Sequence, residues 1–150
     1  MWTNSHPAKG APVASAQPVP DQLPRERRGK THSFRITNHG DSGGTLKGYL
    51  IVSELDDGRP IEVFIKFAKE GSTIAGLGNW IAILMSQALQ SGVPLAELVK
   101  TPIGLAFEPY GSVDDPEIPM ALSVPDYVSR RLALWYCTDA ELTVLGLVDP

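Results

Sequence analysis

The sequence predicts an α+β domain in which an antiparallel sheet is packed by two main helices on one face. Two strand-like runs flank an Asp-Gly turn, and a stripe of apolar residues at helical spacing follows them. A second helical segment lies near the C-terminal end of the chain. Strands that come first and helices that come later are typical of an α+β layout rather than of alternating βαβ units.

Residues 1–30 are predicted to form a disordered, proline-rich arm. They hold five prolines and few large apolar side chains, so they bury too little surface to offset the entropy lost on ordering. Five basic and two acidic residues fall in this arm, whereas residues 31–150 have 8 basic and 15 acidic residues. We therefore expect the folded domain at 31–137. Residues 138–150 form a C-terminal tail in which the LTVLGLV run is a possible terminal strand.

A β-hairpin over about 45–67 is the central feature of the predicted sheet. Its arms, TLKGYLIVSEL and IEVFIKFA, are rich in β-branched and aromatic residues and are joined through a DDGR turn, which is a typical hairpin pattern. A shorter run at 32–36 alternates weakly and indicates one more strand. Alternation in the second arm places on one face Ile61, Val63, Ile65 and Phe67, and on the other Glu62, Phe64 and Lys66.

Two main helices are predicted over about 73–91 and 124–136, with a short helical segment, PLAELVK, between them. The first carries one apolar stripe, with Ser72 or Thr73 as its N-cap and Gly92 at its end. Gly76 and Gly78 each cost about 1 kcal/mol relative to alanine inside a helix. We therefore expect another helix, a symmetry mate or a ligand to approach this part of the helix closely.

Composition excludes several classes of function. The net charge is -4 and the folded part is acidic, so nucleic acid is an unfavourable partner. No run of about 18 apolar residues and no secretory signal is present, so we expect no membrane association. One cysteine, Cys137, cannot form an internal disulfide, and together these features favour a cytoplasmic protein. Three scattered histidines and one cysteine give no metal-ligand spacing, so neither a metal nor another cofactor is predicted.

No catalytic residue is predicted, because no nucleophile lies beside an oriented base in a recognisable pattern. The tentative binding site is an anion or nucleotide site formed by Lys69, Gly71, Ser72, Thr73, Arg130 and Arg131. The first four residues join a strand to a helix N-terminus, where free N–H groups attract anions, and arginine grips phosphate with two hydrogen bonds. The alternatives are that Ser72 or Thr73 only caps the helix and that the arginines form an exposed surface pair.

Four sequence blocks in order resemble one known family. They are PRERRGKTHSF, EVFIKFAKEGSTIAGL, QALQSGVPLAELV and FEPYGSVDDPEIPMALSVPDYVSRRLALWY. Together they resemble the TSCPD-type domain near the C-terminus of adenosylcobalamin-dependent (class II) ribonucleotide reductases. The large reductase barrel, with its radical-forming and redox-active cysteines, has no counterpart in 150 residues. The resemblance therefore implies a domain that does not carry out the reduction by itself.

Three hypotheses about function follow. The first is a free-standing accessory domain that serves nucleotide metabolism and DNA replication by binding a reductase subunit or a nucleotide. The second is a stand-alone homo-oligomer, for example one encoded by a phage, that binds or sequesters a nucleotide or another small anion. The third is a structural homodimer in which Trp80, Phe64 and Trp135 act as exposed aromatic anchors.

Overall fold

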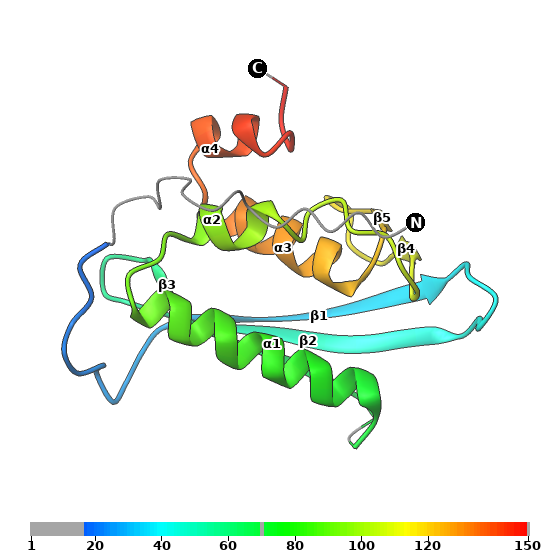
Figure 1. The fold of residues 1–150 in the computed structure, drawn as a ribbon, viewed down its shortest axis with the longest axis horizontal. Helices are drawn as coiled ribbons and strands as arrows, with labels where there is room; N and C mark the ends of the chain where they lie inside the picture. Colours follow the sequence, from blue (N-terminus) through cyan, green and yellow to red (C-terminus); the bar gives the residue numbers. More distant parts are fainter. Residues whose placement is uncertain (1–16, 70, 150) are drawn as a thin grey trace, which may run out of the picture.

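The structure, a computed structural model, describes residues 17–69 and 71–149, and it confirms the predicted α+β class (Figure 1). Its helices and strands have the following bounds: β1 Gly29–Asn38, β2 Thr45–Glu54, β3 Pro60–Phe67, α1 Thr73–Gln90, α2 Leu95–Lys100, β4 Gly111–Val113, β5 Met120–Ala121, α3 Val124–Tyr136 and α4 Asp139–Val144. Within the described residues, no helix is long and apolar enough to cross a membrane.

All five strands pair antiparallel in one sheet with the order β3-β2-β1-β4-β5. The predicted hairpin is β2–β3, and Gly58 in its turn has a φ of 87°, a left-handed conformation that favours glycine. The predicted 32–36 run is the middle of a longer β1. Neither β4 nor β5 was predicted, because strands of three and two residues are too short to show alternation.

One face of the sheet is covered and the other is open to solvent. Along β1, Phe34 and Ile36 are fully buried, while the residues that alternate with them, Ser33, Arg35 and Thr37, are exposed. The predicted alternation of β3 is confirmed: its four apolar positions are buried, and its outer residues are exposed or half-buried. The sheet therefore has one buried face, and the helices lie on that face.

Helix α1 lies over β3, and side chains of both elements fix the contact. Ser86 accepts a hydrogen bond from the N–H of Val63 at 2.9 Å and donates one to its carbonyl at 3.1 Å. At Gly78, a Cβ atom would meet the Phe67 ring at 2.6 Å, so the close approach of helix and strand requires glycine there. The Ser86 contact satisfies backbone groups of a strand at the sheet edge that would otherwise be unpaired.

Helix α3 lies over β1 and has the predicted bounds. Its N-cap is Ser123, whose side chain accepts from the N–H of Asp126 at 3.2 Å. The Tyr127 ring packs on Phe34 with a centroid distance of 4.7 Å. Trp135 is half-buried and meets the His32 ring edge-on at 5.5 Å, so it belongs to the fold rather than to a free surface. Figure 1 shows α2 beside α3 on the same side of the sheet.

The described part of the predicted arm lies against the domain. Gln17 donates from its backbone N–H to the carbonyl of Gly92 at 2.7 Å, and Arg27 pairs with Glu62 at 2.5 Å. Val19 and Leu23 are half-buried against the core. Two apolar side chains thus hold residues 17–28 on the domain, while residues 1–16 of the predicted arm lie outside the described residues.

The tail contains a helix, α4, so the alternative of a terminal strand in the LTVLGLV run is wrong. Thr138 accepts from the N–H of Glu141 at 3.3 Å, and Glu141 accepts from the N–H of Thr138 at 2.8 Å. This reciprocal capping box fixes the first helical turn. Leu142 is buried against the core, so packing and capping together outweigh the β propensity of the LTVLGLV run.

Replacing Gly48 of β2 by alanine should destabilise the domain. A Cβ at this position would meet the ring of Phe34, which is fully buried, at 2.6 Å. We expect Gly48→Ala to lower the free energy of unfolding by about 1–3 kcal/mol, the usual cost of overpacking, in urea denaturation followed by fluorescence. Ser33→Ala, on the open face of the sheet, is the control and should change little. Equal stability of the Gly48 variant and the wild type would contradict this packing.

Candidate functional site

An apolar groove of about 450 Å³ lies between α1 on one side and α2, α3 and the following loops on the other. Its floor is part of β3. The groove is lined chiefly by Ile65 and Phe67 on the floor, Leu77, Ile81 and Leu84 on α1, and Phe107, Pro109 and Val128 opposite. Ser129 is the residue with a polar side chain in this lining.

The walls of the groove are apolar and open to water. Leu77, Ile81, Leu84 and Phe107 are all classed among the exposed large apolar side chains of the chain, and half of the Phe107 surface is accessible. Contiguous apolar surface of this kind marks interaction sites on soluble proteins. Within the described part of the chain, no charged side chain lines the groove, and burying a phosphate without a cation is costly. The groove therefore suits apolar side chains of a partner rather than a nucleotide.

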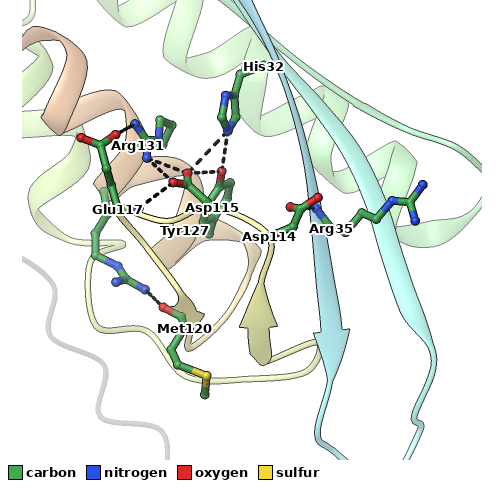
Figure 2. A network of polar contacts seen from close by, with 9 residues as sticks. His32, Arg35, Asp114, Asp115, Glu117, Met120, Tyr127 and Arg131 are labelled. Atoms are coloured by element: carbon green, nitrogen blue, oxygen red, sulfur yellow. Dashed lines mark hydrogen bonds and ion pairs between the residues drawn. The ribbon is translucent and has the colours of Figure 1, made fainter.

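A buried ion pair joins α3 to the segment between β4 and β5 (Figure 2). Arg131 donates to both carboxylate oxygens of Asp115 at 2.6 Å and to Glu117 at 2.6 Å. Arg131 is 3% exposed and Asp115 is 4% exposed. Nη2 makes both contacts to Asp115 and Nη1 makes the contact to Glu117. Charge-assisted bonds with this burial fix the orientation of both elements, and they hold the helix that supplies one wall of the groove.

Tyr127 and His32 complete the same cluster. The Tyr127 hydroxyl donates to Asp115 at 2.8 Å, and Nε2 of His32 lies 2.9 Å from that hydroxyl. Burial opposes the charge on Asp115, but the hydrogen bonds from Tyr127 and the Glu117 N–H, together with the Arg131 charge, lower the pKa of this carboxyl. Burial and the bond to Asp115 raise the pKa of Tyr127. Asp115 is thus the common acceptor of a structural network whose donors are the Arg131 guanidinium and the Tyr127 hydroxyl.

Arg130 is likewise engaged with protein oxygens. It donates to Asp126 at 2.5 Å and to the carbonyl of Met120 at 2.5 Å. Asp126 also accepts from the N–H groups of Gly104 and Leu122, at 2.9 and 3.0 Å. The alternative of an exposed arginine pair is wrong for Arg131, because residues of opposite charge far along the chain enclose it. Anion binding by the two arginines remains a prediction.

The strand-to-helix junction forms a cap. Ser72 accepts from the N–H of Ala75 at 3.3 Å and donates to the carbonyl of Lys69 at 2.9 Å. Gly71 has a φ of 73°, and Lys69 and Thr73 are exposed. Among the described contacts, no hydrogen bond or ion pair joins this junction to Arg130 or Arg131. The structure thus gives the junction a capping role, and its predicted use as an anion site is untested.

Cys137 lies at the end of α3 and has the properties of a neutral thiol. Burial, with a smaller effect of the Glu141 charge, raises the pKa of Cys137 to about 11. The thiol is therefore protonated at neutral pH. In the described parts of the chain, no cluster of three His, Cys, Asp or Glu side chains could hold a metal ion.

Fold and site define an α+β domain with helices on one sheet face and an apolar groove between them. The sequence profile of the TSCPD domain matches residues 18–136, so this chain belongs to the TSCPD domain family. The match begins inside the described part of the predicted arm and ends at the last residue of α3. No solved structure matches the chain.

Curated relatives are vitamin B12-dependent ribonucleotide reductases. The protein from Streptantibioticus cattleyicolor is 38% identical over 141 residues, which cover 94% of this chain and 22% of the relative. The protein from Rhodopirellula baltica is 40% identical over 120 residues, covering 80% of this chain and 11% of the relative. The chain thus spans about a tenth to a fifth of the length of these relatives. It is a ribonucleotide-reductase-related TSCPD domain, as the sequence blocks indicated.

Removing the cation of the buried pair should destabilise the fold strongly. Arg131→Leu leaves Asp115 buried without its cation, which typically costs about 3–5 kcal/mol, measurable by urea denaturation. Arg35→Leu is a matched control, because Figure 2 shows the Arg35 side chain pointing away from the cluster, and it should stay within about 0.5 kcal/mol of wild type. If the uncompensated charge is the cause, adding Asp115→Asn to Arg131→Leu restores part of the loss. A double variant as unstable as the sum of the singles would contradict this explanation.

The same pair should contribute a pH-dependent part of the stability. The folded pKa of Asp115 is lowered from its usual 3.8, so its contribution is complete above about pH 4–5 and is lost as the pH falls through the folded pKa. The stability difference between wild type and Asp115→Asn should therefore be constant from pH 7 to 5 and shrink in more acidic solution. Urea denaturation of both proteins at a series of pH values measures it, and a constant difference down to pH 3 would contradict the lowered pKa.

Proposed function

We propose that this TSCPD domain is a non-catalytic accessory module of ribonucleotide reduction that binds a reductase polypeptide in its apolar groove. The observation that carries the proposal is the groove itself, about 450 Å³ in volume and lined by apolar side chains that are open to water. A concave apolar surface that is accessible from solvent is the usual form of a binding site for apolar groups. Its chemistry selects a partner segment that presents apolar side chains.

The comparisons support a reductase as the partner. In the relatives, the matching region makes up between 10% and 22% of a chain named as a vitamin B12-dependent ribonucleotide reductase. The rest of a reductase chain is therefore the polypeptide beside which a domain of this kind occurs. The apolar groove would then form the buried core of the contact with that neighbour, since interface cores are more apolar than the rest of the surface.

The polar groups support a binding role rather than a catalytic one. Arg131, Asp115 and Tyr127 are committed to one another inside the fold, and the single cysteine of the chain is a neutral thiol at physiological pH. One cysteine supplies no dithiol for a reduction. The domain accordingly contributes to ribonucleotide reduction by its position on a partner and not by chemistry of its own.

Nucleotide binding at Lys69, Gly71, Ser72 and Thr73 has weaker support. Ser72 is engaged in the helix cap, and the arginines predicted to complete the site are engaged with Asp115, Glu117 and Asp126. A nucleotide would have to displace these contacts or use Lys69 and the helix start alone. Thermal shift against a panel of nucleoside triphosphates tests this alternative separately.

A binding assay with the vitamin B12-dependent reductase of the same host tests the proposal. We expect the immobilised chain to bind the purified reductase with a micromolar dissociation constant, since the groove is small. Phe107→Glu and Ile81→Glu place a charge in the groove and should weaken binding at least tenfold. Val144→Glu introduces the same charge on α4, where the side chain is 81% exposed, and should have no effect.

Two outcomes of that assay would contradict the proposal. The first is no binding at reductase concentrations up to about 100 μM, far above the range expected for a specific contact. The second is equal loss of binding in Phe107→Glu and Val144→Glu, because the groove would then have no special part in the contact. Circular dichroism of each variant establishes that the fold is retained.

A further inference from the structure

The side of α1 that faces away from the sheet carries a second uncharged surface, distinct from the groove. We define it as the outer crest of α1, in which the apolar side chains of Trp80 and Ile83 lie between Gly76 and Gln87, all four exposed. Their spacing of four, three and four residues keeps them on one side of the helix, opposite the buried Gly78 and Ala82. Trp80 is 58% exposed and Ile83 is 47% exposed.

The whole helix is free of charge. No acidic or basic residue occurs between Gly71 and Ala96, a stretch that contains all 18 residues of α1. Helices on the surface of a monomer normally have a charged or strongly polar outer face, and helices that are apolar all round are normally buried. The outer crest therefore has the composition of a covered surface, although none of the residues that the structure describes covers it.

Gly76 gives the crest a particular shape. A Cβ at Gly78 would meet Phe67 at 2.6 Å, so the fold itself accounts for that glycine. A Cβ at Gly76 would meet nothing within 4 Å. Glycine inside a helix is unfavourable relative to alanine, and no contact with the residues at 17–69 and 71–149 compensates for it. Gly76 thus leaves a gap in the crest one turn before Trp80, the largest projecting side chain.

We propose that two copies of the chain associate through their outer crests, with Trp80 of each copy lying over Gly76 of the other. A gap and a projection on the same stripe are self-complementary when two helices cross about a two-fold axis, because each residue then contacts the other's counterpart. The bare backbone at Gly76 allows the indole to lie directly on the helix. The small-residue position and the exposed tryptophan thereby have one common explanation.

A second copy fits this surface better than a charged partner. Each chain carries a net charge of -4, and like charges would oppose self-association at most other surfaces. The uncharged α1 places no such repulsion at the contact. The crest presents only two large apolar side chains, Trp80 and Ile83, and small interfaces are typical of weak complexes, so the dimer should form in the micromolar range.

The crest and the groove lie on different sides of α1, so the dimer does not depend on reductase binding. Leu77, Ile81 and Leu84 line the groove, whereas Gly76, Trp80 and Ile83 form the crest. The groove also has a wall from α2 and α3, which has no part in the crest. Phe107→Glu, which introduces a charge into the groove wall, should therefore leave the dimer intact.

Sedimentation velocity of the full chain over about 1–200 μM, a range that brackets a micromolar dissociation constant, tests the proposal. The wild type should change from monomer to dimer with rising concentration. Trp80→Ala and Gly76→Ala should each raise the dissociation constant at least tenfold. Gly76→Ala is the sharper test, because added helix propensity should also raise the thermal midpoint of the monomer, so weaker association would not result from unfolding.

Asn79→Ala is the matched control, since it improves helix propensity at an exposed α1 position off the crest. It should raise the thermal midpoint and leave the dissociation constant unchanged. A wild type that is monomeric at the highest concentration would overturn the proposal. So would a dimer that Gly76→Ala leaves unchanged or strengthens, or one that Phe107→Glu disrupts. The last result would assign self-association to the groove, and reductase binding would still be measured independently.

Discussion

The covering of one apolar sheet face is the constraint on which the rest of the structure depends. Alternation along β1 and β3 puts the large apolar side chains of these strands, except Phe64, on the same side, and burial of that side is the main source of stability. Two helices meet the requirement from different directions: α1 lies over β3 and α3 over β1. The groove is the space that remains where the two helices do not meet, with β3 as its floor.

The buried Arg131–Asp115 pair fixes where the second helix lies. Apolar packing of Tyr127 on Phe34 holds α3 on the sheet, but apolar contacts alone tolerate sliding and rotation. A buried ion pair does not, because moving α3 would leave two charges buried and unpaired. Because both charges lose their hydration on burial, the net contribution of such a pair to the free energy of unfolding is small. Its effect on the position of α3 is large. The groove wall built from α3 has a defined position for this reason.

The sequence was sufficient for the main elements of the fold. Both main helices, the short helix and the hairpin were predicted, since each carries a long periodic pattern or a strong turn signal. The short strands β4 and β5 were missed because they are too short to show alternation and because β4 pairs with the distant β1 while β5 pairs only with β4. The tail was ambiguous, with a terminal strand as one possibility; the Thr138–Glu141 capping box that starts α4 there was not considered.

The candidate site was harder to predict than the fold. Arg131 and Asp115 are 16 residues apart, and no sequence motif pairs them. Their burial depends on the contact between α3 and the segment joining β4 to β5, which the sequence does not show. The groove has no sequence signature, since its lining residues are the same types that form the core. Gly76 was the exception. Its cost in a helix was visible in the sequence, and the structure separated it from Gly78 by showing which glycine the fold itself requires.

Helix α1 thus has three apolar sides with three different explanations. The inner side is buried because it packs on the sheet, and glycine is required at position 78 by the close contact with Phe67. Its groove side is apolar without being filled, and its outer side is apolar where a monomer would place charge. If stability alone had shaped this helix, the outer positions would favour lysine or glutamate and position 76 would favour alanine. Under the proposed dimer, the stability given up at Gly76 and Trp80 would be the cost of association, and the composition of this one helix would follow from a binding role.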